Sequence, residues 1–334
     1  MRAPVVFAVV VTWNRRALLE QCLAHLMAQT RPCDGLIVVD NASDDGTADM
    51  LADAWAGRAT VVRMATNTGG AGGFNAGIRA AVQAGAERLW LMDDDVLAAP
   101  DALQTLLAAE DGLASEGVTS AFLCSSVRSP DGHLTNTPEI DRRENALGYP
   151  VWGERLDRGL IPVRQATFVS LMVSRSAVTR HGLPLAPMFV WGDDTEYTLR
   201  LSRQAPGHLV AASRVVHVRA TPGRLSIETE PEPGRERLHR YLTRNVILAK
   251  RRHEGKGPAA RYALSRLRMA VALALKGRWR KAGVLVAGVM DGARFNPEVE
   301  PCPTSWRRGR AAGGAGCISA VSMAGRRSCC WGWA

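Results

Sequence analysis

Three adjacent carboxylates, Asp93, Asp94 and Asp95, directly follow a short apolar run at residues 89–92. Such a run is typical of a buried strand, so we expect the carboxylates where the strand's carboxyl end meets solvent. Because side chains alternate along an extended backbone, Asp93 and Asp95 should face one side and Asp94 the other. Two carboxylates that face one point suit a hard divalent cation carrying the phosphates of a nucleotide. The alternative interpretation is an acidic turn or a helix N-cap.

A second acidic cluster, formed by Asp193, Asp194 and Glu196, lies between an apolar segment and a predicted amphipathic helix. A carboxylate on the wall of a cleft can act as a general base and take a proton from an attacking hydroxyl. The other interpretation is that one of these acids caps the helix.

His217 lies on a strand-like run at residues 215–218. A single histidine on a strand is usually structural. Together with two oxygen ligands, however, it could complete a metal site, and mixed oxygen and nitrogen ligation favours Mn²⁺ over Mg²⁺.

The first hundred residues alternate between predicted strands and helices. Apolar strands are predicted at residues 5–12, 36–40, 60–64 and before the three aspartates, with a first helix capped by Asn14 and a third helix at about residues 73–84. This succession predicts a parallel sheet covered by helices, in which ligands bind at the carboxyl ends of the strands. Asp40, Asn67 and Asp93 lie just past such ends, so we expect them to line one crevice.

Residues 67–77 contain five glycines. Glycine permits positive φ angles and lets backbone amides approach a ligand closely, whereas the alternative is a flexible turn. The stretch does not follow the first strand and has no G-x-G-x-x-G register, which argues against a dinucleotide-binding fingerprint. The chain also has no G-x-x-x-x-G-K-[ST] motif, which excludes the phosphate-loop NTPases.

The net charge of +10 is unevenly distributed along the 334 residues. Residues 1–200 carry 17 basic and 24 acidic side chains, whereas residues 201–334 carry 25 basic and 8 acidic ones. The basic part could bind an anionic membrane surface or nucleic acid, and charge alone does not choose between them. The scattered Cys22, Cys33 and Cys124 are typical of reduced thiols in a cytosolic protein, and we expect neither a secretory leader nor a membrane-spanning helix.

Five motifs in the same order and spacing resemble family 2 glycosyltransferases. They are VVVTWN at residues 9–14, VVDNASDDGT at 38–47, NTGGAGGF at 67–74, DDD at 93–95 and WGDDTEY at 191–197. The glycine-rich version is similar to that of actinobacterial galactofuranosyltransferases and related rhamnosyltransferases. The resemblance implies an α/β GT-A type nucleotide-binding fold with a mostly parallel sheet, followed by a basic helical C-terminal region.

The resemblance also implies roles for individual residues. Asp193 matches the catalytic base, while Trp191 and Asp194 would contact the acceptor. Asp93, Asp95 and His217 would hold Mn²⁺ or Mg²⁺. The nucleotide-sugar donor would be bordered by Thr12, Asn14, Asp40, Asn67, Gly69, Gly70, Asp93 and Asp94.

The implied reaction is an inverting transfer of a sugar from UDP-galactofuranose or a dTDP-rhamnose type donor. The acceptor would be a hydroxyl of a polysaccharide or lipid-linked glycan in cell-wall or glycan assembly. Two alternatives remain: a nucleotidyltransferase acting on sugar phosphates, and a non-catalytic sugar-binding module. No nucleic acid partner is expected.

These inferences divide the chain into three parts. Residues 1–225 form the catalytic domain, with a nucleotide-sugar half at about 1–100 and an acceptor half at about 101–225. Residues 226–300 form a basic helical region that either lies on the inner face of the plasma membrane or packs, solvated, on the catalytic domain of a cytoplasmic protein. Residues 301–334 lack periodicity and are interpreted as a disordered or atypical tail, or as the product of a reading-frame change.

Overall fold

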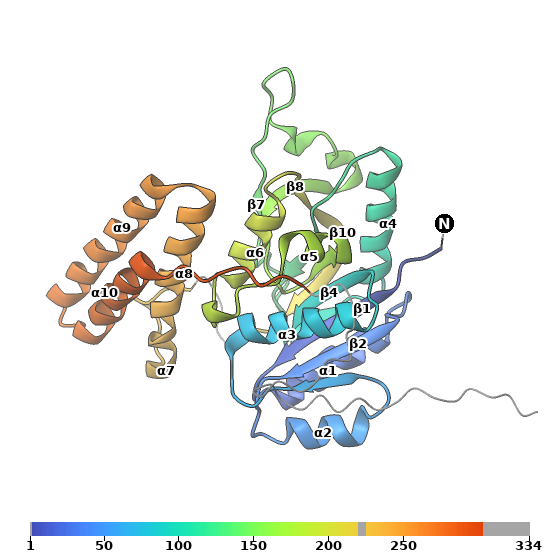
Figure 1. The fold of residues 1–334 in the computed structure, drawn as a ribbon, viewed down its shortest axis with the longest axis horizontal. Helices are drawn as coiled ribbons and strands as arrows, with labels where there is room; N and C mark the ends of the chain where they lie inside the picture. The colour runs from blue at the N-terminus through green and yellow to red at the C-terminus, as the bar shows by residue number, and fades with distance from the viewer. Residues whose placement is uncertain (1, 220–224, 303–334) are drawn as a thin grey trace, which may run out of the picture.

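The computed structural model describes residues 2–219 and 225–302, which form one central sheet and a group of helices beside it (Figure 1). The strands are β1 (Val6–Thr12), β2 (Gly35–Asp40), β3 (Thr60–Arg63), β4 (Arg88–Asp93), β5 (Val96–Ala98), β6 (Leu123–Arg128), β7 (Glu139–Ile140), β8 (Leu160–Gln165), β9 (Leu171–Ser174) and β10 (Gly207–His217). The helices that pack on them are α1 (Arg16–Met27), α2 (Thr47–Ala54), α3 (Gly69–Gln83), α4 (Ala102–Ser115), α5 (Arg175–His181) and α6 (Asp193–Leu201).

The strands are ordered β3-β2-β1-β4-β9-β6-β10-β8-β7, and β5 pairs with β10. The first four are mutually parallel, and β6 is parallel to β10. This confirms the predicted α/β fold with a mostly parallel central sheet, to which β9, β8, β7 and β5 add antiparallel pairs. Thr12 pairs with Asp40 and Val11 with Asp93, so the carboxyl ends of β1, β2 and β4 meet at one edge.

Strand β10 brings a distant part of the chain to this edge. It runs antiparallel to β5, with His217 opposite Val96. The backbone amide of Val218 donates to the carbonyl oxygen of Asp95 over 2.8 Å. His217 therefore lies beside the acidic turn although more than a hundred residues separate them in the sequence.

Alternating side chains of β1 face two separate cores. Ala8 and Val10 pack with α1, α2 and α4 on one face, in a core that includes Trp90. Val9 and Val11 pack with α3 and α6 on the other, in a core that includes Phe74. A parallel sheet buried on both faces accounts for the nearly continuous apolar runs of its strands.

The glycine-rich stretch is helical, which corrects the prediction of a turn followed by a helix from about residue 73. Helix α3 begins at Gly69, and its Gly73 and Gly77 face the sheet. A Cβ atom on Gly73 would overlap the side chain of Val11, and one on Gly77 would lie 2.5 Å from Val9 Cγ1. The glycines therefore allow this helix to pack very close to β1, and this tertiary contact outweighs their low helix propensity.

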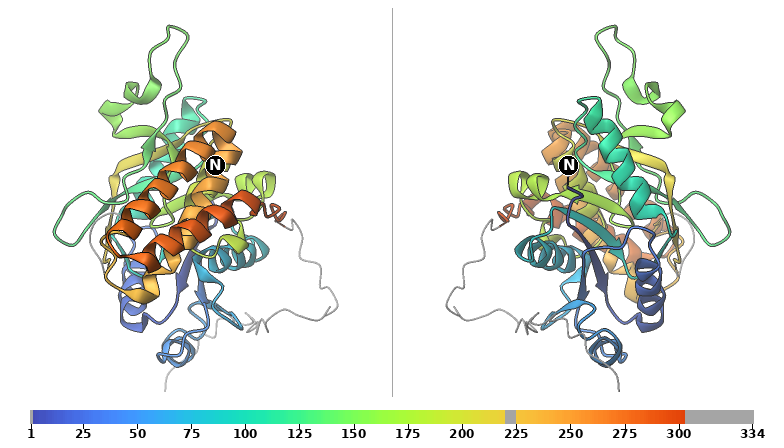
Figure 2. Two further views of the ribbon diagram at one scale, coloured as in Figure 1. Left: turned by 90° about the vertical axis from the view of Figure 1, so that its left-hand side faces the viewer. Right: turned by 90° about the vertical axis from the view of Figure 1, so that its right-hand side faces the viewer.

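The C-terminal region is helical, as predicted. It comprises α7 (Pro233–Glu236), α8 (Leu238–His253), α9 (Lys256–Leu275) and α10 (Trp279–Arg294). Helix α8 packs against α6, and α9 and α10 form an outer layer, which faces the viewer in the left panel of Figure 2. No described helix is both long and apolar enough to cross a lipid bilayer.

The chain returns to the catalytic domain after α10. The amide of Leu183 donates to Glu300 O over 2.9 Å, and Cys302 is buried in the core beneath α3. The helical region is therefore fixed to the catalytic domain at both ends. The remainder of the predicted tail, residues 303–334, lies outside the described residues.

Candidate metal and nucleotide-sugar site

Asp93, Asp95 and His217 converge at the carboxyl edge of the sheet, as predicted. One ligand atom from each lies within 4.8 Å of the others, and Asp95 Oδ1 is 3.0 Å from His217 Nε2. The other ring nitrogen of His217 fixes the orientation of the imidazole, because Nδ1 lies 3.0 Å from Asn136 Oδ1. When Nδ1 donates this hydrogen bond, Nε2 keeps a lone pair for a cation.

These residues fit a hard divalent cation. Asp95 Oδ1 is buried and, among the described residues, has no hydrogen-bond donor apart from the imidazole beside it. Two carboxylate oxygens and one imidazole nitrogen are a donor set compatible with Mn²⁺ or Mg²⁺. The cluster thus favours a metal site over an acidic turn or a helix cap.

The pKa values of Asp93 and Asp95 both depart from their ordinary values. Burial, and then the charge of Asp95, raises the pKa of Asp93 to about 7. Burial also disfavours the charged form of Asp95, but the hydrogen bond and charge of His217, together with Arg15, hold its pKa below the ordinary value. A bound cation would favour the charged form of both groups.

Asp94 is not part of the three-residue cluster. It accepts hydrogen bonds from Thr12 Oγ1 over 2.7 Å and from Arg15 Nη1 over 3.2 Å. Arg15 Nη1 also lies 2.7 Å from Asp95 Oδ2, so one guanidinium neutralises two of the three carboxylates. Burial nevertheless raises the pKa of Asp94 to about 6. Sequence reasoning missed Arg15, although its place directly after the first strand was a usable signal.

The predicted helix cap at Asn14 is wrong. Arg15 occupies the N-cap of α1, and Asn14 has a positive φ of 52°. Its side chain instead exchanges two hydrogen bonds with Asp44, from Nδ2 to Asp44 Oδ1 over 2.7 Å and from the Asp44 amide to Oδ1 over 2.8 Å. Asn14 therefore joins the end of β1 to the loop after β2, at the same edge as the acidic cluster.

Asp40 is fully buried at the end of β2. Its Oδ1 accepts from the Ser43 amide over 2.9 Å. Its Oδ2 has no hydrogen-bond partner in the described structure and lies 3.8 Å from Arg63 Nε. An acceptor atom without a donor is compatible with the predicted contact to the nucleotide base.

Asn67 and Gly69 belong to a polar network that Asn41 organises. Asn41 Nδ2 donates to Asn67 Oδ1 over 3.1 Å and to Gly69 O over 2.9 Å, and its Oδ1 accepts from the Thr68 amide over 2.9 Å. Asn41 is buried and was not predicted. Gly70 has open space where a Cβ would lie, so the two glycines of the predicted donor site differ in their surroundings.

Asp193 is buried at the start of α6. Burial, then Asp194 and Asp93, raises the pKa of Asp193 well above the ordinary value. Gly192, with φ of 89°, is the N-cap of α6, and no side chain caps this helix. The cap interpretation is therefore wrong for these acids. Burial raises the pKa of Asp194 to about 6.

Glu196, in the same cluster, has a structural role. Its carboxylate lies 3.0 Å from Arg200, 3.6 Å from Arg252 and 3.4 Å from His253. Burial opposes its charge, yet the hydrogen bond from His253 and the charge of Arg200 keep its pKa below the ordinary value. This ion-pair network joins α6 to α8.

The segment before Asp193 is strained and held in place from two sides. Phe189 and Trp191 have positive φ angles of 66° and 60°. On one side, the amide of Ala71 in α3 donates to Phe189 O over 3.0 Å. On the other, Asn245 Nδ2 in α8 lies 2.8–3.1 Å from three carbonyl oxygens, those of Met188, Val190 and Trp191. Non-glycine residues at positive φ persist where the surroundings determine them.

Trp191, predicted to contact the acceptor, packs against the C-terminal region. Its ring centroid is 5.0 Å from that of His239, and the Arg235 guanidinium lies 5.6 Å from its centroid. Trp191 is therefore packed against α7 and the start of α8.

Fold and site together define a glycosyltransferase with a GT-A-like fold. Residues 7–168 match the family described as Glycosyl transferase family 2. Galactofuranosyltransferase GlfT1 of Mycobacterium tuberculosis (strain ATCC 25618 / H37Rv) is 32% identical over 270 residues, which span 73% of this chain and 82% of the relative. The chain belongs to glycosyl transferase family 2.

A further relative is similar in sequence, and two solved structures share the fold. Galactofuranosyltransferase GlfT1 of Mycolicibacterium smegmatis is 31% identical over 214 residues, covering 60% of this chain and 66% of the relative. A mannosyltransferase from Pyrobaculum calidifontis, solved with GDP-Man and Mn²⁺, shares the fold with a TM-score of 0.50, 18% identity and coverage of 87% and 88% of the two chains. GalNAc-T7, solved with UDP, GalNAc and Mn²⁺, has a TM-score of 0.50 and 13% identity over 72% of this chain and 48% of that one.

Proposed function

We propose that this protein is an inverting glycosyltransferase that uses a UDP-galactofuranose or dTDP-rhamnose type donor. The acceptor is a hydroxyl of a glycan or lipid-linked glycan in cell-wall or polysaccharide assembly. The observation that carries the proposal is Asp193, a buried carboxylate at the start of α6 whose pKa is raised in part by the charge of Asp93, a member of the Asp93–Asp95–His217 cluster. The similarity to galactofuranosyltransferases favours galactofuranose as the sugar.

Asp93, Asp95 and His217 would hold the Mn²⁺ or Mg²⁺ ion, which would stabilise the negative charge on the departing diphosphate. Asp193 takes the proton of the acceptor hydroxyl, whose oxygen then bonds to the anomeric carbon of the donor. The bond from that carbon to the diphosphate oxygen breaks on the opposite face, and the diphosphate leaves with the electron pair. One such displacement inverts the anomeric configuration.

The remaining site residues bind and orient the two substrates. Trp191 and Asp194 position the acceptor next to Asp193. The donor is bordered by Thr12, Asn14, Asp40, Asn67, Gly69, Gly70 and Asp94 in addition to Asp93. Membership of family 2 favours glycosyl transfer over the alternatives of a nucleotidyltransferase or a non-catalytic sugar-binding module.

We also propose that the outer helical layer rests on an anionic membrane surface on the cytoplasmic side. Large apolar side chains are exposed there, among them Leu275 (84% exposed), Trp279 (69%) and Met290 (61%). Cations such as Arg268 and Lys276 lie on the same two helices and their connection, a combination typical of interfacial helices. Sedimentation with anionic liposomes tests this proposal, and a protein that stays in the supernatant at moderate salt would contradict it.

A panel of UDP- and dTDP-sugars tests the enzymatic proposal. With Mn²⁺ present, the true donor should raise the melting temperature, because a ligand that binds only the folded state stabilises it. The same donor should be hydrolysed slowly without acceptor, and chelation should stop the hydrolysis. Stabilisation by a nucleoside triphosphate plus a sugar phosphate, with no effect of any nucleotide sugar, would favour the nucleotidyltransferase instead.

A further inference from the structure

Glu230 is a buried carboxylate in the connection between β10 and α7. It is 6% exposed, whereas the residues on either side of it, 228–229 and 231–232, are exposed. It is not a member of the metal cluster, and none of the five sequence motifs includes it. A buried carboxylate is costly unless it is paired and hydrogen-bonded, so its partners show what it holds in place.

The backbone around Glu230 is attached to the start of α10. Lys281 Nζ donates to the carbonyl oxygen of Glu230 over 2.7 Å, and Arg278 Nη1 donates to that of Glu228 over 3.0 Å. Ile227 is buried in a small core between α9 and α10. These contacts fix the position from which the side chain of Glu230 extends.

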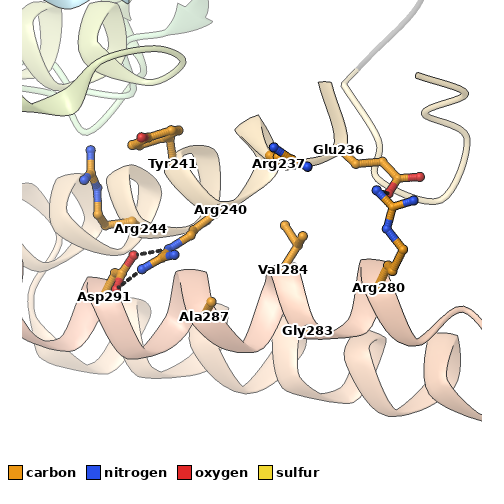
Figure 3. Close-up of a pocket in the computed structure, with 10 residues that line it drawn as sticks. All are labelled: Glu236, Arg237, Arg240, Tyr241, Arg244, Arg280, Gly283, Val284, Ala287 and Asp291. Atoms are coloured by element: carbon orange, nitrogen blue, oxygen red, sulfur yellow. Dashed lines mark hydrogen bonds and ion pairs between the residues drawn. The ribbon is translucent and has the colours of Figure 1, made fainter. Parts of the chain in front are cut away.

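Helix α7, which follows this segment, is held by the same part of α10. Glu236, at the end of α7, lies 3.7 Å from Lys281 Nζ and 3.9 Å from Arg280 Nη2. Figure 3 shows Glu236 and Arg280 pointing toward one another at one end of the groove between α8 and α10. The segment and α7 are therefore anchored together on α10.

The side chain of Glu230 joins α7 to α8. Arg235 Nε, in α7, donates to Oε2 over 3.4 Å and lies 3.3 Å from Oε1. His239 Nε2, in α8, lies 3.7 Å from Oε2. Removal of one partner from a buried charged group leaves the others uncompensated. The carboxylate therefore determines where the Arg235 guanidinium and the His239 ring lie.

Both of these partners contact Trp191. The ring centroids of His239 and Trp191 are 5.0 Å apart, and the Arg235 guanidinium lies 5.6 Å from the indole centroid. Trp191 is itself partly exposed and has a positive φ of 60°, so its conformation depends on the surroundings. Glu230 is thus connected to the indole through two side chains that come from two helices.

We propose that Glu230 is a positioning residue for the acceptor, because it holds Arg235 and His239 and through them fixes the indole of Trp191. The inference rests on the proposed function, in which Trp191 contacts the acceptor. Loss of the carboxylate weakens acceptor binding and leaves the donor and metal residues as they are.

Glu230→Gln tests this proposal, because it removes the charge and keeps the shape of the side chain. The acceptor is the octyl glycoside, from a panel of octyl hexosides, for which the wild type has the lowest KM. This KM should rise about tenfold, since hydrogen bonds and ion pairs of a charged group are lost. The donor KM and the rate of donor hydrolysis should stay unchanged, which also shows that the variant is folded. Glu228→Gln, at an exposed carboxylate of the same segment, is the matched control.

A double-mutant cycle with Trp191→Ala separates positioning from general stability. In the Trp191→Ala background, Glu230→Gln should change the acceptor KM less than about twofold, because its effect is transmitted by the indole. If Glu230→Gln does not fold, Arg235→Gln tests the same link at a side chain that is 27% exposed, and it should raise the acceptor KM severalfold.

An unchanged acceptor KM in the folded variant would overturn the proposal. So would an equal rise with and without Trp191, or a parallel rise of the donor KM, since Glu230 would then only stabilise the fold. A wild type that transfers sugar to no member of the panel would instead count against the proposed glycosyl transfer itself.

Discussion

The side-chain amide of Asn245 lies 2.8 Å from the carbonyl oxygen of Trp191, two residues before the candidate base Asp193. Asn245 is fully buried in α8, whereas Trp191 belongs to the catalytic domain. The C-terminal region therefore holds the strained segment that precedes the candidate base in its conformation.

Replacement of Asn245 should impair turnover more than donor binding. Asn245→Asp keeps the size of the side chain but turns a donor into an acceptor facing three carbonyl oxygens. We expect kcat to fall about 100-fold, as a displacement of roughly 1 Å at a reacting group would cause, with the donor KM unchanged. Asn296→Asp is the control, because Asn296 only accepts a hydrogen bond, from Arg252. A parallel loss of donor affinity and kcat would indicate general unfolding.

Gly69 and Gly70 should respond oppositely to alanine. Gly69 has a φ of 71°, and a Cβ there would overlap the carbonyl oxygen of Phe189. We expect Gly69→Ala to lower the free energy of unfolding by about 2 kcal/mol or more. Gly70 lies in the helix with open space around it, so Gly70→Ala should be neutral or stabilising by up to about 1 kcal/mol. Urea unfolding of the two variants measures the difference, and similar values would refute the close packing of α3.

Glu196 should contribute stability that depends on pH. Its pKa in the folded state is below the ordinary value of 4.5, so its contribution is present above pH 4.5 and is lost as the pH falls through the folded-state pKa. Glu196→Gln should therefore lower the free energy of unfolding by about 3 kcal/mol at neutral pH. This difference between the wild type and the variant should disappear in acid. Glu254→Gln, in a more exposed pair, should cost less than about 1 kcal/mol. A difference in unfolding free energy that stays constant from pH 7 to pH 3 would contradict the claim that the ionised Glu196 stabilises the fold.

Within the acidic triplet, Asp94 should tolerate asparagine best. An asparagine at position 94 keeps an oxygen that can accept from Thr12 Oγ1, as Asp94 does over 2.7 Å. Asp93→Asn and Asp95→Asn each remove an anionic ligand of the proposed metal. We expect the Mn²⁺ concentration for half-maximal donor hydrolysis to rise at least about tenfold in these two variants. If Asp94→Asn needed as much metal as they do, the division of roles within the triplet would be wrong.

The meeting of polar residues at one edge of the sheet was predictable because they follow simple patterns. Apolar runs identify β1, β2 and β4, and polar residues directly after parallel strands must meet at one edge of the sheet. The family resemblance was needed for His217, because no local pattern indicates that β10 returns beside the acidic turn. The same is true of Asp193, whose cluster could equally have capped a helix.

Other features depend on contacts that a sequence does not display. Asn245 binds carbonyl oxygens of a segment whose positive φ angles arise only in the folded protein. The glycines of α3 have low helix propensity, and only the proximity of Val9 and Val11 explains why a helix forms there. Arg15 could have been inferred from the need to neutralise three carboxylates, but many arginines were candidates.

The central claim is that Asp193 acts as the base in a metal-dependent sugar transfer, and Asp193→Asn tests it most directly. The variant should keep the melting-temperature increase given by the donor and Mn²⁺, because the substitution leaves the Asp93–Asp95–His217 cluster intact. Its kcat for transfer to the acceptor should fall about 1000-fold, as expected on loss of a general base. Near-normal transfer by Asp193→Asn, with donor binding preserved, would remove Asp193 from the mechanism.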